Sequence, residues 1–242
     1  MQPEEYDKMY ALEDRHWWFA AKRLFAQVFL KQLSGRKRKI LDVGCGTGRN
    51  MVMLKEWGQV SGADVNDLAL KYCRRRGLLQ VKKASAESLP FKGGKFDLVM
   101  IFDVLYHRGI KNDLVVLKEV YRVTKPGGYL LVTDCAHPWL FGPHDVAMQA
   151  RQRYSKQELK AKIIKAGFSV RRASFIFMST FPLFLINRLL KKYFRGGSQS
   201  DVSALPKWLN TFLLTLNRLE SKLLNYFNLP IGSSIIVWAQ KP

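Results

Sequence analysis

A short apolar run that ends in three closely spaced glycines constrains the fold more than any other feature of this sequence. The run extends from Ile40 to Val43, and the glycines are Gly44, Gly46 and Gly48. A buried strand that turns at glycines lets the backbone approach a ligand closely, at the carboxyl edge of a parallel sheet. The spacing differs from the dinucleotide fingerprint and lacks the Gly-Lys-Ser/Thr ending of a nucleoside triphosphatase loop. We therefore expect a ligand other than a triphosphate at this loop.

Strands and helices alternate on both sides of the loop. The predicted strands are 40–43, 60–63, 78–82, 96–102, 129–133, 168–175 and 235–239. The predicted helices are 14–33, 50–57, 68–76, 111–123, 156–166, 183–194 and 208–226. Short apolar strands that alternate with helices imply right-handed crossovers and a parallel sheet covered on both faces. The chain then divides into an N-terminal helical cap at 1–37, a core at 38–175, a helical insertion at 176–231 and a last core strand at 232–242.

The net charge indicates which classes of partner are suitable, and the spacing of the cysteines indicates which kinds of site to expect. The 242 residues include 40 Lys and Arg against 19 Asp and Glu, a net charge of +21 that suits nucleic acid, anionic lipid or phosphorylated substrates. Cys45, Cys73 and Cys135 are widely spaced, so we expect neither a disulfide framework nor a metal site. The sequence shows no secretory signal and no apolar stretch long enough to cross a membrane, which favours a cytoplasmic protein, peripheral at the membrane if bound there.

Asp64 is the first polar candidate for ligand binding outside the loop. It lies 20 residues after Gly44, at the end of the second predicted strand. A carboxylate there can accept hydrogen bonds from both hydroxyls of a ribose. The alternative is that Asp64 caps the helix that starts near Asp67.

With these features in place, the chain resembles the class I S-adenosylmethionine-dependent methyltransferases over most of residues 38–175. The matching stretches, in the family's order, are ILDVGCGTG (40–48), GADVN (62–66), AESLPF (86–91), FDLVMIFDVLYH (96–107), EVYRVTKPGGYLLVTD (119–134) and YSKQELKAKIIKAGF (154–168). The resemblance implies an α/β, Rossmann-like, seven-stranded and mostly parallel sheet whose last strand is antiparallel. It also implies S-adenosyl-L-methionine as cofactor and S-adenosyl-L-homocysteine as product.

The resemblance also implies which residues hold the cofactor. They are Asp42, Gly44, Gly46, Asp64, Ser85, Ala86 and Phe102. The backbone of the two loop glycines would cradle the methionine part above Asp42, and Asp64 would hold the ribose hydroxyls. The residues at 85–86 would lie beside the adenine, and Phe102 would close the pocket. The family often has Asp where Ser85 stands, and a serine offers fewer acceptor sites to the adenine amino group.

The first residues of the chain sharpen the resemblance. His16-Trp17-Trp18-Phe19, with Tyr6 and Arg23, looks like the leader of a set of bacterial and archaeal methyltransferases of this class. In that set the leader implies a cap over the cofactor. Lys22 stands where the leader commonly has Arg.

Two histidines are candidates for catalysis. His107 follows the fourth predicted core strand, and an ordinary imidazole titrates near neutrality, so it can serve as a general base. The alternative is a loop histidine that shapes the pocket or binds substrate by a hydrogen bond. His16 is the second candidate, and its alternative is an aromatic helix face packed on the core. We propose no metal.

These features predict methyl transfer to an oxygen or nitrogen of a small or lipid-linked acceptor by in-line displacement, with the apolar and basic insertion covering the substrate. Alternatives are a methyltransferase for RNA or another macromolecule, and a non-catalytic cofactor-binding partner subunit. Two basic stretches, 71–83 and 147–196, hold more than half of the net charge and are predicted to face the acceptor. The helix at 183–194, with Arg188, Lys191 and Lys192, either contacts an anionic membrane surface or packs against the helix at 208–226.

Overall fold

The computed structural model describes residues 3–33, 38–193 and 205–242. Its centre is a seven-stranded sheet in the order β3-β2-β1-β4-β5-β7-β6. The strands are β1 (Arg38–Val43), β2 (Gly58–Asp64), β3 (Val81–Lys83), β4 (Phe96–Phe102), β5 (Thr124–Cys135), β6 (Ser169–Ile176) and β7 (Ser234–Gln240). Strands β1 to β5 pair in parallel, and β7 runs antiparallel to both β5 and β6. The predicted fold class is therefore confirmed.

The strand order reverses between β1 and β4, which lie side by side although two strands separate them in the chain. At such a switch point the connections leave in opposite directions, so a crevice opens beyond the carboxyl ends of the two strands. The glycine loop follows β1, and Asp103 to His107 follow β4. The predicted ligand loop and the predicted catalytic histidine thus leave neighbouring strands at the same edge.

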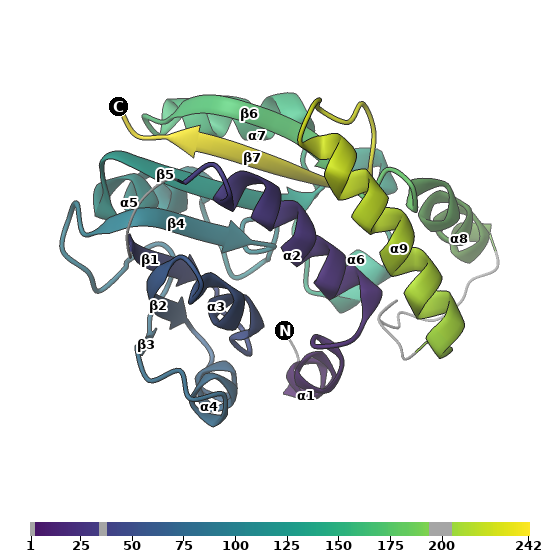
Figure 1. Cartoon of the computed structure of the whole chain (residues 1–242), viewed down its shortest axis with the longest axis horizontal. Coiled ribbons are helices and arrows are strands. Elements are labelled where there is room, and N and C mark those ends of the chain that lie inside the picture. Colours follow the sequence, from purple (N-terminus) through teal and green to yellow (C-terminus); the bar gives the residue numbers. More distant parts are fainter. Residues whose placement is uncertain (1–2, 34–37, 194–204) are drawn as a thin grey trace.

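Helices cover both faces of the sheet (Figure 1). They are α1 (Pro3–Leu12), α2 (Trp17–Leu30), α3 (Arg49–Leu54), α4 (Asp67–Arg75), α5 (Asp113–Val123), α6 (Pro143–Ala147), α7 (Lys156–Lys165), α8 (Phe181–Tyr193) and α9 (Lys207–Leu224). Apolar side chains of α2, α3 and α9 pack on one face of the sheet, and those of α5 and α7 on the other. Every second side chain of a strand points to the same face, and β4 accordingly divides its residues between the two cores.

The leader differs from its prediction. The helix expected over 14–33 is present as α2, but a further helix, α1, precedes it and is joined to it at residues 13–16. Pro3 in the first turn and the acids Glu4 and Glu5 favour a helix start there, because proline fixes a helical φ and acids complement the helix dipole. His16 ends the joint as the N-cap of α2.

The insertion contains the two predicted helices, and the second of them lies along α2 (Figure 1). Asn210 of α9 joins the start of α2: its Oδ1 accepts from the Trp17 N–H at 2.8 Å, and its Nδ2 donates to the Arg15 carbonyl at 3.0 Å. Residues 196–200, Gly-Gly-Ser-Gln-Ser, which the sequence predicts to be a linker between the two helices of the insertion, lie outside the described residues.

Candidate active site

The loop after β1 keeps a backbone shape that only glycine adopts readily. Gly44, Gly46 and Gly48 have φ angles of +69°, +52° and +87°. A Cβ atom on Gly44 would lie 2.3 Å from the Val104 side chain, which follows β4. The N–H groups of Gly44 and Cys45 both donate to the Ala63 carbonyl of β2. The loop is therefore held close to β2 and β4, and a side chain at Gly44 would clash with the segment that follows β4.

Asp64 is tied directly to this loop. Its Oδ2 accepts from the Gly46 N–H at 2.9 Å, and its Oδ1 accepts from the Asn66 N–H at 2.9 Å. Asp64 is buried, and this burial raises the pKa of its carboxyl even though the two backbone N–H groups oppose the shift. The cap of α4 is Asn66, whose side chain accepts from Leu68 N–H, so the alternative that Asp64 caps this helix is wrong. Each carboxylate oxygen keeps a second acceptor position for a ligand hydroxyl.

Asp42 lies beneath the loop, in β1. Its side chain is fully buried, and within the described residues its Oδ2 has no hydrogen-bond partner. Burial, reinforced by the nearby Asp64 and Glu13 carboxylates, raises the pKa of Asp42 well above its usual range. A buried acceptor without a partner costs free energy, so it suits a site completed by a ligand that brings a cation or a donor.

The residues predicted to lie beside the adenine and to close the pocket are not all brought together. Ser85 Oγ accepts from the Glu87 N–H at 3.1 Å, and Ala86 is buried with the core on the α5 face. Phe102 packs into the other core, with the side chains of α2. The structure thus brings Asp42, the loop glycines and Asp64 together, and it places Phe102 and Ala86 in different layers.

The leader covers the loop. Tyr6 of α1 is buried near Asp64, whose negative charge adds to burial in raising the tyrosine pKa. Met9 of α1 approaches Gly46 so closely that a Cβ there would lie 3.0 Å from its terminal methyl. Behind them Glu13 accepts from Thr47 Oγ1 and pairs with Arg76 at 2.9 Å. The N-terminal segment therefore forms a cap over the glycine loop.

His107 follows β4 by five residues and is half-buried. Its Nδ1 accepts from the Gly109 N–H at 3.0 Å, so a neutral ring carries its proton on Nε2. Burial, with the nearby Arg108, lowers the pKa of His107 from 6.5 to about 4. At neutral pH the ring is a hydrogen-bond donor through Nε2 and a weak base. This arrangement suits substrate binding, which sequence reasoning kept open, better than proton removal.

His16 acts as a structural cap in this conformation. Its Nδ1 accepts from the Trp18 N–H at 3.3 Å, and its ring contacts Trp17 and Phe19. The contacts match the alternative of an aromatic helix face packed on the core. A catalytic role for His16 stays a prediction.

Sequence reasoning missed an ion pair at the carboxyl end of β4. Lys22 of α2 pairs with Asp103, and its Nζ lies 3.7 Å from the centre of the Trp18 ring. The Lys22 side chain is almost fully buried, whereas that of Asp103 is 19% exposed. Asp103 has a φ of +56°, a strained value for a residue with a side chain, and its Oδ1 has no partner within the described residues. No sequence pattern reveals this φ or a contact across 81 residues.

Several cations predicted to face the acceptor instead hold the fold together. Arg76, from the stretch 71–83, pairs with Glu13 and Asp14 of the leader. From the stretch 147–196, Arg153 and Arg188 both pair with the buried Asp145 of α6, at 2.8 Å and 3.1 Å. The side chains of Lys191 and Lys192 lie outside the described residues. The prediction failed for Arg76 because its acidic partners lie 62 and 63 residues away in the sequence, and for Arg153 and Arg188 because both point inward to one buried carboxylate.

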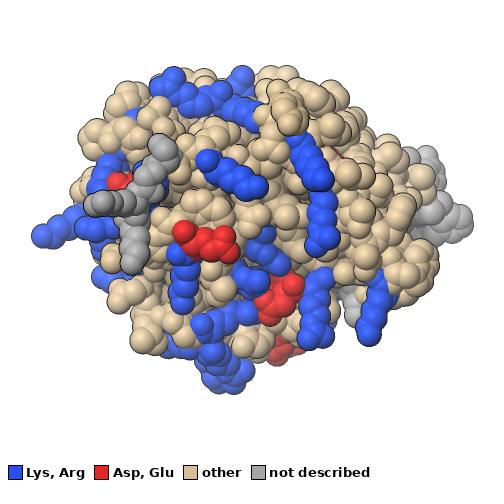
Figure 2. Space-filling model, in the orientation of Figure 1, with Lys and Arg blue, Asp and Glu red and all other residues tan. Residues whose placement is uncertain are grey.

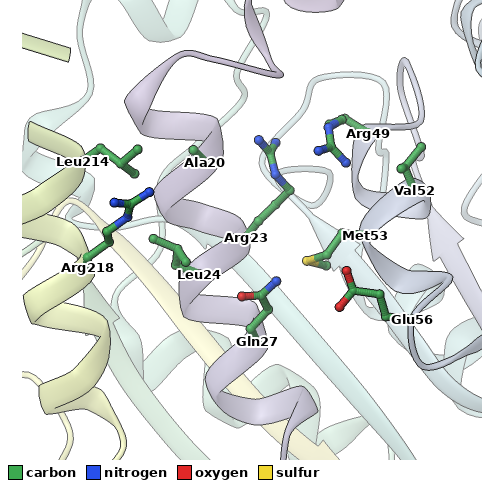
Figure 3. Close-up of a pocket in the computed structure, with 10 residues that line it drawn as sticks. All are labelled: Ala20, Arg23, Leu24, Gln27, Arg49, Val52, Met53, Glu56, Leu214 and Arg218. Carbon is green, nitrogen blue, oxygen red and sulfur yellow. The ribbon is translucent and has the colours of Figure 1, made fainter. Parts of the chain in front are cut away.

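A groove of about 280 Å³ opens outside the sheet, between α2, α3 and α9 (Figure 3). Arg23 and Arg49 reach toward one another across its rim, whereas Arg218 enters from α9. Burial and the charge of Arg49 lower the pKa of Arg23 to about 10. None of the predicted cofactor or catalytic residues lines this groove, so it is separate from the candidate site.

Comparison with known proteins decides the family. Residues 41–132 match the family model described as a methyltransferase domain. Residues 41–132 are a methyltransferase domain of the class I S-adenosylmethionine-dependent type. The cofactor of this methyltransferase family is S-adenosyl-L-methionine, which leaves as S-adenosyl-L-homocysteine. The match does not include the leader, so the narrower resemblance of His16 to Phe19 stays a prediction.

Relatives and solved structures agree with this family. The chain is 29% identical over 184 residues to a phthiotriol/phenolphthiotriol dimycocerosates methyltransferase of Mycobacterium ulcerans, covering 70% of this chain and 66% of that protein. It is 39% identical over 115 residues to a demethylmenaquinone methyltransferase of Geobacillus stearothermophilus, covering 43% and 48%. The chain thus spans about half to two thirds of the length of these relatives. An S-adenosylmethionine-dependent methyltransferase from Thermotoga maritima shares the fold, with a TM-score of 0.59, 20% identity and coverage of 99% and 96%.

Among the described residues, no group of three or more His, Cys, Asp or Glu side chains could hold a metal ion. None of the helices in the described part of the chain is long and apolar enough to cross a membrane.

Proposed function

We propose that this methyltransferase transfers a methyl group to an oxygen or nitrogen of a small or lipid-linked acceptor. The observation that carries the proposal is the contact of Asp64 with the Gly46 N–H, which joins a carboxylate suited to ribose hydroxyls to a loop built on three glycines. The names of the relatives from Mycobacterium ulcerans and Geobacillus stearothermophilus support an apolar acceptor, because they point to a lipid and a quinone.

The residues of the loop fit the cofactor. Gly44 and Gly46 would hold its methionine part and Asp64 its ribose hydroxyls. Asp42 Oδ2, which has no partner within the described residues, would hold its ammonium group. When bound, S-adenosylmethionine supplies a methyl group on a sulfonium: the acceptor lone pair forms the new bond as the carbon–sulfur bond breaks, and that electron pair stays on sulfur. The protein must then align the acceptor and exclude water.

The leader and His107 would supply that alignment. Tyr6 and Met9 cover the loop and keep water from it. The Nε2–H of neutral His107 would donate a hydrogen bond to the acceptor at the end of β4. Because the pKa of His107 is low, the proton of an acceptor hydroxyl or amine would pass to solvent instead of staying on the ring. Asp103, 19% exposed beside Lys22, is the second polar group placed to orient the acceptor.

Labelled methyl transfer tests the function. The protein is incubated with S-adenosylmethionine labelled in its methyl group and with a lipid extract, and the label is followed into the organic phase. We expect label in a lipid product, and the stability of that product to acid and base distinguishes ether, ester and amine. The Asp64→Ala variant is the control that should transfer none. Absence of transfer by the wild type to both lipid and water-soluble acceptors would contradict the proposal.

A further inference from the structure

The outward side of α9 carries a continuous apolar stripe. Its members are Trp208, Phe212, Leu219, Leu223 and Tyr226, which follows the last turn. Their spacings of four, seven, four and three residues return to one side of a helix with 3.6 residues per turn. All five are exposed, and the two aromatic residues at the ends are the most exposed, at 72% for Trp208 and 84% for Tyr226.

The stripe is not needed to attach α9 to the rest of the molecule. The opposite side of the helix does this with Leu213 and Leu224, which are buried, and with Glu220. The Glu220 carboxylate accepts from the N–H groups of Met178 and Ser179, before α8. A helix on the surface of a soluble domain usually turns a polar side to water, so an apolar stripe here indicates a further contact.

Charge indicates the nature of that contact. Lys207, Arg218 and Lys222 are exposed, and at spacings of eleven and four residues they follow one edge of the stripe. The one acidic residue of α9, Glu220, is buried on the other side. Figure 2 agrees: the surface over α9 is mostly tan and blue, and the two large red patches of this view lie nearer its middle.

We infer that the outward side of α9 binds a membrane surface that contains anionic lipid. Leucine and phenylalanine would enter the boundary between headgroups and acyl chains, the basic edge would contact lipid phosphates, and Trp208 and Tyr226 would lie at headgroup level. A second copy of this chain is a poorer occupant, because pairing two such sides would bring cations of the same helix together.

The position of α9 connects this surface to the candidate site. Asn210, on the second turn of α9, holds the joint between α1 and α2 through Arg15 and Trp17. A membrane bound along α9 would therefore lie beside the cap of the glycine loop. As an account of how a lipid-linked acceptor reaches the protein, the inference rests on the proposed function, although the membrane contact itself depends only on α9. The predicted use of Arg188 for this contact is wrong, since that side chain is buried against Asp145.

Vesicle flotation tests the inference with the full chain. The protein is floated with vesicles of phosphatidylcholine alone or of phosphatidylcholine with phosphatidylglycerol. We expect binding to the anionic vesicles that weakens with added salt, because salt screens exposed charges. The double variant Phe212→Ser/Leu219→Ser should bind to the anionic vesicles at least about tenfold more weakly than the wild type, because it removes two side chains that would enter the boundary between headgroups and acyl chains.

Matched controls separate the stripe from general apolar or basic surface. Leu79→Ser removes a leucine that is 78% exposed near β3, and it should leave binding unchanged. Arg218→Gln/Lys222→Gln should reduce binding to the anionic vesicles only, and Lys92→Gln, an exposed lysine between β3 and β4, should not. Thermal unfolding of each variant confirms that it folds.

Three results would overturn the inference: no preference of the wild type for anionic vesicles, equal loss of binding in Leu79→Ser, or a dimer in sedimentation that the Phe212→Ser/Leu219→Ser variant abolishes while no vesicles bind. Binding of S-adenosylhomocysteine is measured on the same samples. If vesicle binding fails and cofactor binding persists, the membrane contact is rejected and the proposed function stands. If vesicle binding persists and no methyl transfer occurs, the membrane contact stands and the proposed function is rejected.

Discussion

The proposed cofactor side, at the glycine loop, and the proposed acceptor side, at the end of β4 and the helices beside it, are held together over very different distances along the chain. Asp64 contacts Gly46 and Asn66, which lie 18 and 2 residues away. On the acceptor side, Lys22 contacts Asp103 across 81 residues, and Trp17 contacts Asn210 across 193. The contacts of Asp64 are set by local backbone geometry. The contacts of Lys22 and Trp17 form only after distant segments of the chain have come together.

This difference predicts that the two sides respond differently to substitution. A change on the cofactor side should weaken ligand binding and leave most of the fold intact. A change on the acceptor side should release the leader or the insertion and lower the free energy of unfolding first.

The largest effect is expected at Lys22. Lys22→Met removes one partner of an ion pair whose lysine is buried and leaves the Asp103 charge without compensation, so we expect a loss of about 3–5 kcal/mol in unfolding free energy. Urea unfolding measures it. Lys31→Met, the same change at an exposed position that follows α2, is the control. The double variant Lys22→Met/Asp103→Asn should recover much of the loss, and failure to recover would mean that the pair does not act as a unit.

Asp64 comes next and tests the cofactor side. Asp64→Ala removes an acceptor that holds the loop and would hold the ribose, so S-adenosylhomocysteine should bind about 10–150-fold more weakly, the equivalent of about 1.5–3 kcal/mol. Titration calorimetry measures the affinity. Asp67→Ala, which removes an exposed carboxylate paired with Lys83, should bind as the wild type does. Equal affinity of the Asp64 and Asp67 variants would contradict the site.

A smaller effect is expected at Asn210. Asn210→Ala removes both hydrogen bonds between α9 and the leader and should cost about 1 kcal/mol in unfolding free energy. Thr211→Ala, at the exposed neighbouring position, is the control. The affinity for S-adenosylhomocysteine should change little, since Asn210 is bonded to the joint of the leader and not to the glycine loop. A cofactor defect larger than the stability defect would show that the two sides are coupled more tightly than their contacts indicate.

The smallest effect concerns pH and His107. The folded pKa is about 4 and the ordinary value is 6.5, so between these values the unfolded chain binds a proton that the folded chain does not. Stability should therefore fall as the pH falls from 6.5 toward 4. In His107→Gln this part of the decline should disappear, as seen in unfolding temperatures across that range. Because His107 is partly exposed, the difference will be modest, and identical pH profiles would place its pKa near the ordinary value.

The same contrast explains what the sequence could predict. The glycine loop and the alternating strands follow from local spacing, whereas the antiparallel last strand and the cofactor were expected from the resemblance to class I methyltransferases. Helix α1 of the leader was missed, although Pro3 and two acids marked a helix start. The ion pairs of Lys22 with Asp103 and of Arg76 with Glu13 could not be foreseen, because no local sequence pattern encodes a contact between distant segments.

The place of β7 in the sheet has a consequence for how the protein is made. It lies between β5 and β6, yet its residues, Ser234–Gln240, follow both of these strands in the sequence. On a ribosome β6 therefore emerges before the strand that joins it to β5, and the Trp17 N–H can bond Asn210 only after α9 has been synthesised. Strands β1 to β5 can pair earlier in synthesis than the far edge of the sheet and the contact of α9 with the cap.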